Sequence, residues 1–190
     1  LFNSFKNDNI IVSIGDFGAL NWDGKEDYFF SNESNLGKII SINLISKEID
    51  ILSKGHRNPQ GLIYVDKKNL IINTEHGPKG GDEININTLD AVKNFGWPIA
   101  SYGIRYNGDD PFKKNHKNFS EPIKYYNSSI APSQIIKKFN KNSFIFATLK
   151  DKSLHEIEFS NDFTKLINQK RFLIEERIRD IIHIQKGVYA

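Results

Sequence analysis

The sequence predicts an all-β fold, and three observations support that prediction. Apolar residues occur in short bursts and do not keep the helical spacing of three and four residues over long windows. The bursts are rich in β-branched residues, and turns of Gly, Asn, Asp and Lys separate them. No apolar run approaches the roughly 20 residues that a membrane helix requires. The chain of 190 residues is long enough to bury one good core.

The strands are expected in chain order wherever such a burst occurs. A β-propeller, in which each blade is a small antiparallel meander, gives a string of strands of this kind. A β-sandwich gives a similar string, so the spacing alone leaves both architectures open. The expected strands cover residues 10–14, 38–44, 49–52, 62–65, 70–73, 83–87, 143–149, 154–159, 171–174 and 178–184.

Three stretches between the strands are expected as loops: residues 55–61, 74–82 and 96–126. The third is long, aromatic and polar. Long ordered loops in a compact domain usually have a function, and the aromatic residues argue against disorder here. The part from 108 to 120 resembles nothing that we can assign.

The composition indicates a soluble globular protein, with 38% hydrophobic and 26% charged residues. The net charge is +3, and no Lys/Arg run is dense enough to predict nucleic-acid binding. Cysteine is absent, which excludes disulfides and thiolate metal sites and suits an exported protein. Residues 1–20 show no signal peptide.

The first candidate site is the loop G-H-R-N-P-Q-G at residues 55–61. Pro59 restricts the residue before it to extended geometry, and the two glycines permit tight backbone turns. The loop therefore displays Arg57, Asn58 and Gln60 rigidly. Arginine offers a fork of donors to a carboxylate, and asparagine offers both a donor and an acceptor. A polar turn between two strands has the same pattern, and this interpretation stays open.

The second candidate is E-H-G-P-K-G-G-D-E at residues 75–83, with three glycines and three acids. Glycine-rich loops expose backbone carbonyls, and Ca²⁺ takes such oxygens together with carboxylates. A phosphate-binding loop requires G-x-x-x-x-G-K-[ST], which residues 77–82 do not supply. His56 and His76 suggest a transition-metal pair, but a third ligand is not evident.

A third candidate is the pair Arg177 and Arg179. Alternation along a strand puts both side chains on the same side, while Asp180 faces the other way. Two neighbouring cations repel each other unless an anion lies between them. An acidic ligand or an acidic strand is therefore expected opposite the pair, and a solvated strand face is the alternative.

Together these motifs resemble the soluble PQQ-dependent aldose sugar dehydrogenases of the glucose/sorbosone dehydrogenase family. The order and spacing of the motifs agree over residues 11–182. The E-H-G-P-x-G-G-D-E block is the most specific of them. The matching motifs are G-H-R-N-P-Q-G-L at 55–62, E-H-G-P-K-G-G-D-E-I-N at 75–85, N-F-G-W-P at 94–98, S-Y-G at 101–103, A-P-S at 131–133, L-K at 149–150 and R-I-R-D at 177–180.

The resemblance implies a six-bladed β-propeller, of which residues 1–190 form part of a single domain, truncated at both ends, as an incomplete arc of about three to four blades. It implies oxidation of the anomeric hydroxyl of an aldose to a lactone, with PQQ as electron acceptor and an external acceptor after it. The implied cofactors are PQQ and Ca²⁺. The implied location is periplasmic or secreted.

The resemblance also assigns site residues. It implies that Arg57 and Asn58 bind the quinone side of PQQ, and that Gly77 and Pro78 give backbone carbonyls to Ca²⁺. The further implied PQQ contacts are Lys150, Arg177 and Arg179 at its carboxylates, with His76 and Ser129 at additional positions. A set of cations suits a flat tricarboxylate.

One departure concerns catalysis. The family's catalytic His lies shortly before the strand that ends here in Gly15-Asp16, and none of the five histidines of this chain occupies that position. The catalytic His is therefore expected upstream of Leu1, and residues 1–190 alone are expected to be inactive. The alternative is a propeller of the same family that binds a ligand without catalysis. Such domains are usually Cys-rich, unlike this chain.

Overall fold

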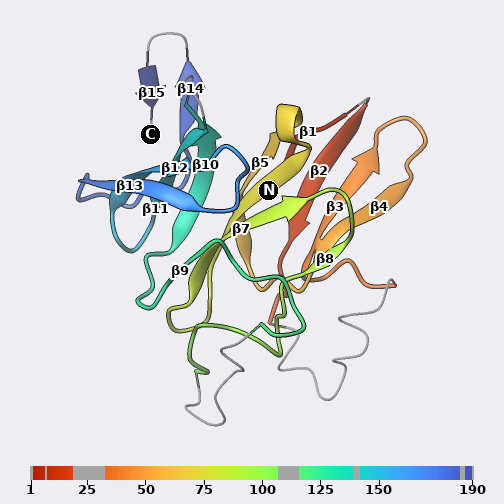
Figure 1. Ribbon diagram of the computed structural model, residues 1–190, viewed down its shortest axis with the longest axis horizontal. Coiled ribbons are helices and arrows are strands. Elements are labelled where there is room, and N and C mark those ends of the chain that lie inside the picture. Colours follow the sequence, from red (N-terminus) through yellow and green to blue (C-terminus); the bar gives the residue numbers. More distant parts are fainter. Residues whose placement is uncertain are drawn as a thin grey trace.

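The computed structural model describes residues 2–6, 8–18, 33–106, 116–138, 142–184 and 187–189. In these ranges the chain consists of β-sheets, and the described part contains no α-helix. No helix in these ranges is long and apolar enough to cross a membrane. Four sheets follow one another along the chain, each built mainly from sequence neighbours paired antiparallel (Figure 1).

The first sheet has five strands in the order β1-β2-β3-β4-β8. β8 comes from a later part of the chain and pairs parallel to β4, which places the residues after it beside the first sheet. The strands are β1 (Phe2–Ser4), β2 (Asn9–Ile14), β3 (Lys38–Asn43), β4 (Ile49–Lys54) and β8 (Lys93–Asn94).

The second sheet has the order β5-β6-β7-β9 and lies between the first and the third (Figure 1). A 3₁₀ turn, η2 (Asp66–Lys68), joins β5 to β6. β6 is buried along its whole length, polar residues included, because the neighbouring sheets cover both of its faces. The strands are β5 (Pro59–Val65), β6 (Leu70–Glu75), β7 (Asp82–Thr88) and β9 (Lys124–Tyr126).

The third sheet is a simple meander in the order β10-β11-β12-β13, and a two-stranded hairpin of β14 and β15 follows it. β12 alternates strictly between buried and half-buried residues, as expected for a strand with one face on a core. The strands are β10 (Pro132–Lys137), β11 (Ser143–Thr148), β12 (Ser153–Phe159), β13 (Leu166–Leu173), β14 (Ile182–Ile184) and β15 (Gly187–Tyr189).

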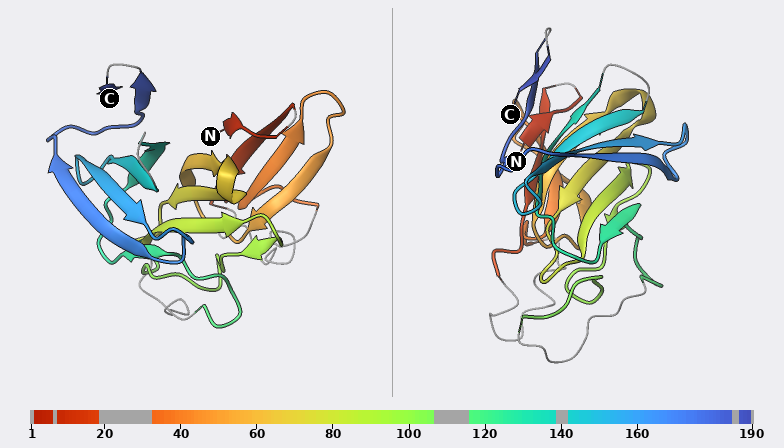
Figure 2. Two further views of the ribbon diagram at one scale, coloured as in Figure 1. Left: turned by 45° about the horizontal axis from the view of Figure 1, so that its top comes forward. Right: turned by 90° about the vertical axis from the view of Figure 1, so that its left-hand side faces the viewer.

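Apolar cores lie between successive sheets. One core joins residues of β5–β7, such as Ile72 and Ile84, to the aromatic residues Phe144 and Phe146 of β11. A second joins Ile11 and residues of β3 to the other face of the second sheet. The first strands of the three larger sheets, β1, β5 and β10, lie together. β5 contacts β10 of the third sheet and β1 and β2 of the first. The sheets fan out from that line, as Figure 2 shows in its left view.

This arrangement confirms the all-β prediction and resolves the two open architectures. The chain forms an arc of a β-propeller, with three sheets of four or five strands and a two-stranded start of a fourth. The expected arc of about three to four blades is therefore confirmed. Every expected strand overlaps an observed one.

Several expected boundaries are wrong. The predicted strand 178–184 begins only at Ile182, because Ile178 is tied to the third sheet by two separate bonds. Its N–H donates to the Thr148 carbonyl (3.2 Å), and its carbonyl accepts the Ser133 hydroxyl (2.7 Å). Parts of the expected loops are strand: residues 59–61 belong to β5, 74 and 75 to β6, 82 to β7 and 124–126 to β9. In the unassigned segment 108–120, residues 108–115 lie outside the described part.

Candidate cofactor site

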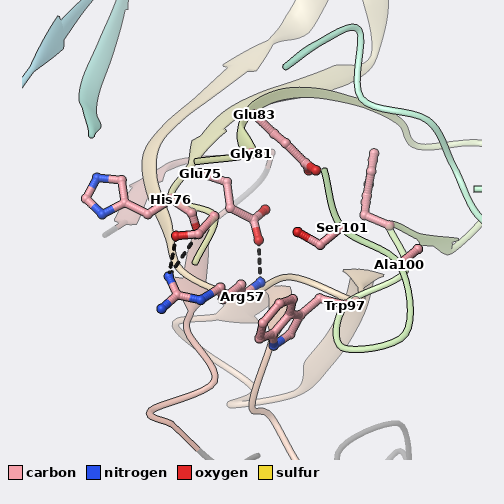
Figure 3. Close-up of a pocket in the computed structure, with 11 residues that line it drawn as sticks. Arg57, Glu75, His76, Gly81, Glu83, Trp97, Ala100 and Ser101 are labelled. Atoms are coloured by element: carbon pink, nitrogen blue, oxygen red, sulfur yellow. Dashed lines mark hydrogen bonds between the residues drawn. The ribbon is translucent and has the colours of Figure 1, made fainter. Parts of the chain in front are cut away.

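Three of the predicted site residues, Arg57, His76 and Gly77, line one pocket. Residues from the stretches 55–57, 75–83 and 95–101 surround this pocket. Figure 3 shows Arg57 and Trp97 at one side of this pocket, with the carboxylates of Glu75 and Glu83 directed into it. The pocket therefore combines a guanidinium, two carboxylates and an aromatic ring.

Arg57 is held at both its backbone and its side chain. Its N–H donates to a carboxylate oxygen of Glu75, and its carbonyl accepts the Asp16 N–H (2.8 Å). Its Nη1 donates to the His76 and Gly77 carbonyls (3.1 and 2.9 Å). The guanidinium carbon lies 5.6 Å from the ring centre of Trp97, within cation–π distance. The Arg57 side chain is thus fixed before any ligand is considered.

Glu75 is the buried anchor below Arg57. Its second oxygen contacts Nδ1 of His56 (2.8 Å) and accepts the side-chain amides of Asn85 (3.2 Å) and Asn73 (3.4 Å). The other ring nitrogen of His56 bonds the Ser53 hydroxyl (2.8 Å). His56 is therefore a fully bonded core histidine, and the open hypothesis of a transition-metal pair with His76 gains no support. In the described ranges no group of three His, Cys, Asp or Glu residues is arranged to hold a metal ion.

The structure brings Asn58, His76 and Arg179 together through Gln60. Gln60 accepts from Arg179 (3.3 Å) and donates to Asn58 (2.8 Å), and the Asn58 amide nitrogen lies 3.4 Å from His76 Nδ1. Burial lowers the pKa of His76, and the charges of Arg57 and Arg179 lower it further, although Asp82 acts in the opposite direction. Two cations predicted to bind PQQ are thus close enough to act on the same imidazole.

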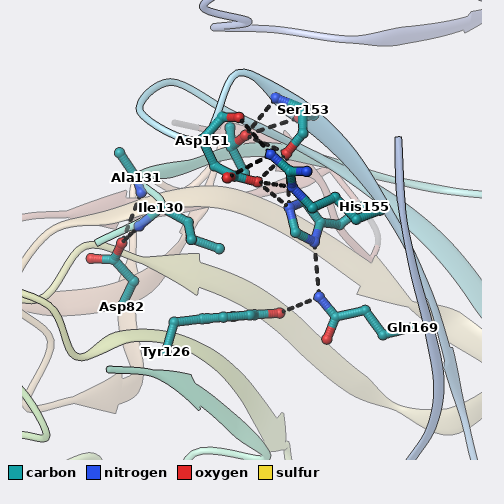
Figure 4. A network of polar contacts seen from close by, with 10 residues as sticks. Asp82, Tyr126, Ile130, Ala131, Asp151, Ser153, His155 and Gln169 are labelled. Atoms are coloured by element: carbon teal, nitrogen blue, oxygen red, sulfur yellow. Dashed lines mark hydrogen bonds and ion pairs between the residues drawn. The ribbon is translucent and has the colours of Figure 1, made fainter. Parts of the chain in front are cut away.

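Asp82 ties the 76–81 turn to the segment before β10, and Figure 4 shows its bonds to Ile130 and Ala131 in that segment. One of its oxygens accepts the Gly77 N–H (2.9 Å), and the other accepts the N–H groups of Ile130 and Ala131 (both 2.7 Å). The predicted contact Ser129 lies in the same junction, where its hydroxyl accepts the Gly80 N–H (2.8 Å). Asp82 therefore fixes the relative position of two parts of the predicted site.

The turn that carries Lys150 is braced from two sides. The N–H groups of Lys150 and Asp151 both donate to the Ile130 carbonyl (3.1 Å each). The Asp151 carboxylate accepts Nε and Nη2 of Arg171 (2.7 and 2.9 Å), and it also contacts Ser153 and His155 (Figure 4). The Arg171 hydrogen bonds hold the pKa of Asp151 well below its usual range. The Lys150 backbone is thus set beside the Ser129 segment.

Arg177 and Arg179 are exposed and flank the buried Ile178. The two arginines are thus both on the exposed side of Ile178, as predicted, but Asp180 is exposed as well and the segment lies outside a strand. Arg179 is the member of the pair that bonds Gln60. For Lys150 and Arg177, the described residues include no side-chain hydrogen bond to the other predicted site residues, so their convergence on the site stays a prediction.

The carbonyls predicted to bind Ca²⁺ have partners in the protein. Arg57 donates to Gly77, and the Tyr106 hydroxyl donates to the Pro78 carbonyl (3.1 Å). A carbonyl oxygen has two lone pairs, so each retains one for another partner. Oxygen ligands suit Ca²⁺, which takes about six to eight of them. The two carbonyls fit a part of such a shell, and a bound cofactor and water have to supply the rest.

Gln60, Asp82 and Trp97 are parts of the site that sequence reasoning did not assign a role. Trp97 is fixed by its indole N–H, which donates to Asp16 (2.9 Å), and by its backbone N–H, which donates to the Gly55 carbonyl (3.0 Å). All three lie inside the motifs that resemble the family, and this was the only signal in the sequence that they belong to the site. Each has at least one partner that is distant in the sequence, and no local pattern reveals these pairs.

Glu83 is expected to make the stability of the folded protein depend on pH, and a substitution can test this. Burial, and next the charge of Glu75, raise the pKa of Glu83 well above its usual value. A raised pKa favours the folded state while Glu83 is neutral, so this stability is present below the unfolded pKa of about 4.3 and is lost as pH rises through the folded pKa. Glu83→Gln mimics the neutral form. We therefore expect this variant to lose less stability than the wild type as the pH rises.

Urea unfolding of the full-length protein across this pH range measures the effect. Glu176→Gln, at an exposed position, is the control and should leave the pH profile unchanged. Parallel wild-type and Glu83→Gln profiles would show that folding does not change the pKa of Glu83.

Comparison with known proteins gives a consistent result. Residues 4–190 match the family model described as Glucose / Sorbosone dehydrogenase. The Escherichia coli protein named aldose sugar dehydrogenase YliI is 35% identical over 144 residues, which are 70% of this chain and 38% of that protein. Quinoprotein glucose dehydrogenase B of Acinetobacter calcoaceticus is 37% identical over 79 residues, which are 35% of this chain and 16% of that protein.

Comparison with solved structures finds relatives of the same family. The crystal structure of the soluble aldose sugar dehydrogenase from Escherichia coli, in its apo form, superposes with a TM-score of 0.76 at 25% identity. The superposition covers 100% of this chain and 59% of that chain. The chain spans about half or less of the length of the curated relatives that it matches.

Proposed function

Because the chain belongs to the glucose/sorbosone dehydrogenase family, we propose that its full-length protein is a PQQ-dependent aldose dehydrogenase that oxidises the anomeric hydroxyl to a lactone. Residues 1–190 then form part of one larger propeller domain. The single observation that supports this most is that Asn58, His76 and Arg179 are joined in one hydrogen-bonded assembly. Arg57 adjoins it through its bond to the His76 carbonyl.

The donor set fits the proposed cofactor. PQQ carries three carboxylates, and each charge-assisted hydrogen bond to such a group contributes roughly 1.5–3 kcal/mol. We assign Lys150, Arg177 and Arg179 to the carboxylates, Arg57 and Asn58 to the quinone side, and His76 and Ser129 to additional contacts. Gly77 and Pro78 are assigned to Ca²⁺. When bound, PQQ accepts the two electrons of the sugar, and Ca²⁺ acts as a Lewis acid.

The other parts of the site support and shape it. Glu75 holds the Arg57 backbone, and Trp97 lies at the guanidinium. Asp82 holds Gly77 in place from below. These groups organise the cation and the carbonyls before a ligand arrives, which reduces the free energy spent on ordering the site during binding.

We expect the proton acceptor of the reaction to lie N-terminal to Leu1. Three of the described histidine rings have hydrogen-bond partners in the protein: His56 bonds Glu75 and Ser53, His76 bonds Pro132, and His155 bonds Asp151 and Gln169. His116 is buried and stacks on the Tyr102 ring. The proposal also implies export, an aldose as substrate, and an external acceptor that reoxidises the cofactor.

Titration of PQQ into the Ca²⁺-loaded full-length protein tests the proposal. We expect a change in the PQQ absorption spectrum and reduction of an artificial dye with at least one aldose. A spectral change without dye reduction for any aldose would favour the non-catalytic binding module. The absence of both responses would overturn the proposal altogether.

A further inference from the structure

Gln60 lies between two residues proposed to contact the cofactor, and its orientation is determined by one of them. Nη1 of Arg179 donates to Oε1 of Gln60 at 3.3 Å, and Nε2 of Gln60 donates to Oδ1 of Asn58 at 2.8 Å. A guanidinium has donors only. The amide oxygen of Gln60 must therefore face Arg179, and its NH₂ group must face Asn58.

The same reasoning determines the next two links. Because the oxygen of Asn58 faces Gln60, its NH₂ group faces Nδ1 of His76, 3.4 Å away, and this nitrogen has to be the acceptor. Nε2 then carries the ring proton and donates to the Pro132 carbonyl at 2.8 Å. A carbonyl only accepts. These hydrogen bonds thus form a chain from an obligate donor, Arg179, to an obligate acceptor, the Pro132 carbonyl. Every group between them has one orientation.

The backbone under Gln60 has little room to shift. Gly61 follows it in β5, and a Cβ atom at Gly61 would lie 2.5 Å from the Ser133 carbonyl and 2.6 Å from the Thr74 hydroxyl. The Gly61 N–H donates to that hydroxyl at 2.8 Å, and the hydroxyl donates to the Ser133 carbonyl at 2.7 Å. β5 is therefore held against β10, the strand that contributes Pro132. This fixes Gln60 relative to the Pro132 end of the hydrogen-bonded chain.

We propose that Gln60 is a positioning residue of the cofactor site, which holds the Asn58 amide and the His76 ring in one orientation and couples them to Arg179. This inference rests on the proposed function and deepens it. In the described part of the chain, His76 takes one hydrogen of the Asn58 NH₂ group, and the other has no protein acceptor. Such an N–H is suited to a carbonyl oxygen of the kind that a quinone presents.

The histidine tautomer gives a test that does not depend on activity. Ring ¹⁵N spectra of the apo full-length protein should show the proton of His76 on Nε2. Gln60→Glu replaces the NH₂ group with an acceptor, so Asn58 must turn its own NH₂ towards the new carboxylate and its oxygen towards His76. Nε2 keeps its proton, because the Pro132 carbonyl still requires a donor, so Nδ1 loses its hydrogen bond from Asn58 and we expect the Nδ1 resonance to shift in this variant. Gln60→Leu removes both bonds, leaves Asn58 free to turn, and should shift the Nδ1 resonance in part.

The second measurement is PQQ affinity. Loss of two hydrogen bonds that orient the site should weaken PQQ binding about five- to tenfold in Gln60→Leu. Gln169→Leu is the matched control for the spectra, because Gln169 bridges His155 and the Tyr126 hydroxyl by the same kind of amide bonds (2.8 and 3.0 Å). It should alter the His155 signals and leave those of His76 unchanged.

The outcomes separate this inference from the proposed function. An unchanged His76 Nδ1 resonance in Gln60→Glu, or unchanged PQQ affinity in folded Gln60→Leu, would overturn the positioning role. If Gln60→Leu does not fold, Gln60→Glu, which keeps size and polarity, decides both measurements. A wild-type protein that binds no PQQ would refute the proposed function and, with it, a role for Gln60 in cofactor binding, even if the His76 Nδ1 resonance shifts as expected.

Discussion

Asp82→Asn is expected to lower the free energy of unfolding of the full-length protein by about 2–4 kcal/mol. Asp82 is 1% exposed and accepts three backbone N–H groups, from Gly77, Ile130 and Ala131. An asparagine has one oxygen, so its NH₂ group must face at least one of these donors. A buried N–H then loses its acceptor, and the remaining bonds lose their charge assistance.

Urea unfolding measures this difference. Asp50→Asn is the matched control, because Asp50 is exposed in β4, and its substitution should change stability by no more than about 0.5 kcal/mol. Comparable small effects of the two substitutions would mean that the junction held by Asp82 adapts without loss. Since Asp82 joins the Gly77 turn to the segment of Ser129, the variant should also bind PQQ more weakly.

Arg57→Ala is expected to weaken PQQ binding by roughly 1.5–3 kcal/mol, which is about ten- to more than a hundredfold in Kd. The guanidinium bonds the His76 and Gly77 carbonyls and lies at the rings of Trp97 and Tyr106. It is therefore already ordered, and the bond that it makes to a ligand has a small entropic cost.

Two further variants define the cause of the effect. Arg57→Lys keeps the charge but loses the planar fork, and it should recover only a part of the affinity. Lys165→Ala removes one positive charge at an exposed position in the turn before β13, and it should leave PQQ affinity unchanged. Equal affinities of Arg57→Ala and Lys165→Ala would show that Arg57 is an ordinary surface cation.

The strands that sequence reasoning found are those whose pattern is local. The runs of Ile in β2 and β3 and the alternation in β12 are visible in any short window. β10 was missed because it opens with Pro132-Ser133-Gln134, which reads as a turn. The end of β6 was predicted as a loop because Thr74 and Glu75 are polar, yet both residues are buried in the structure.

The site residues were predictable only through their motifs. Arg57, Asn58 and His76 belong to blocks of residues that resemble a known family, and the structure connects them. The bond of Gln60 to Arg179 spans 119 positions, and those of Asp82 to Ile130 and Ala131 span 48 and 49. No periodicity reports such pairs, because they arise from the packing of one sheet against the next.

These separations have a consequence for the order of folding. Apart from β8 and β9, the strands of each sheet are neighbours in the sequence, while the Gln60–Arg179 bond joins residues 119 positions apart. Loop-closure entropy grows with length, by about 0.6 kcal/mol for each doubling, and contacts of high sequence separation are slow to form. The individual sheets are therefore expected to gain protection from hydrogen exchange first. The polar chain from Arg179 to Pro132 forms only when the second and third sheets have docked and the segment after β13 has folded back.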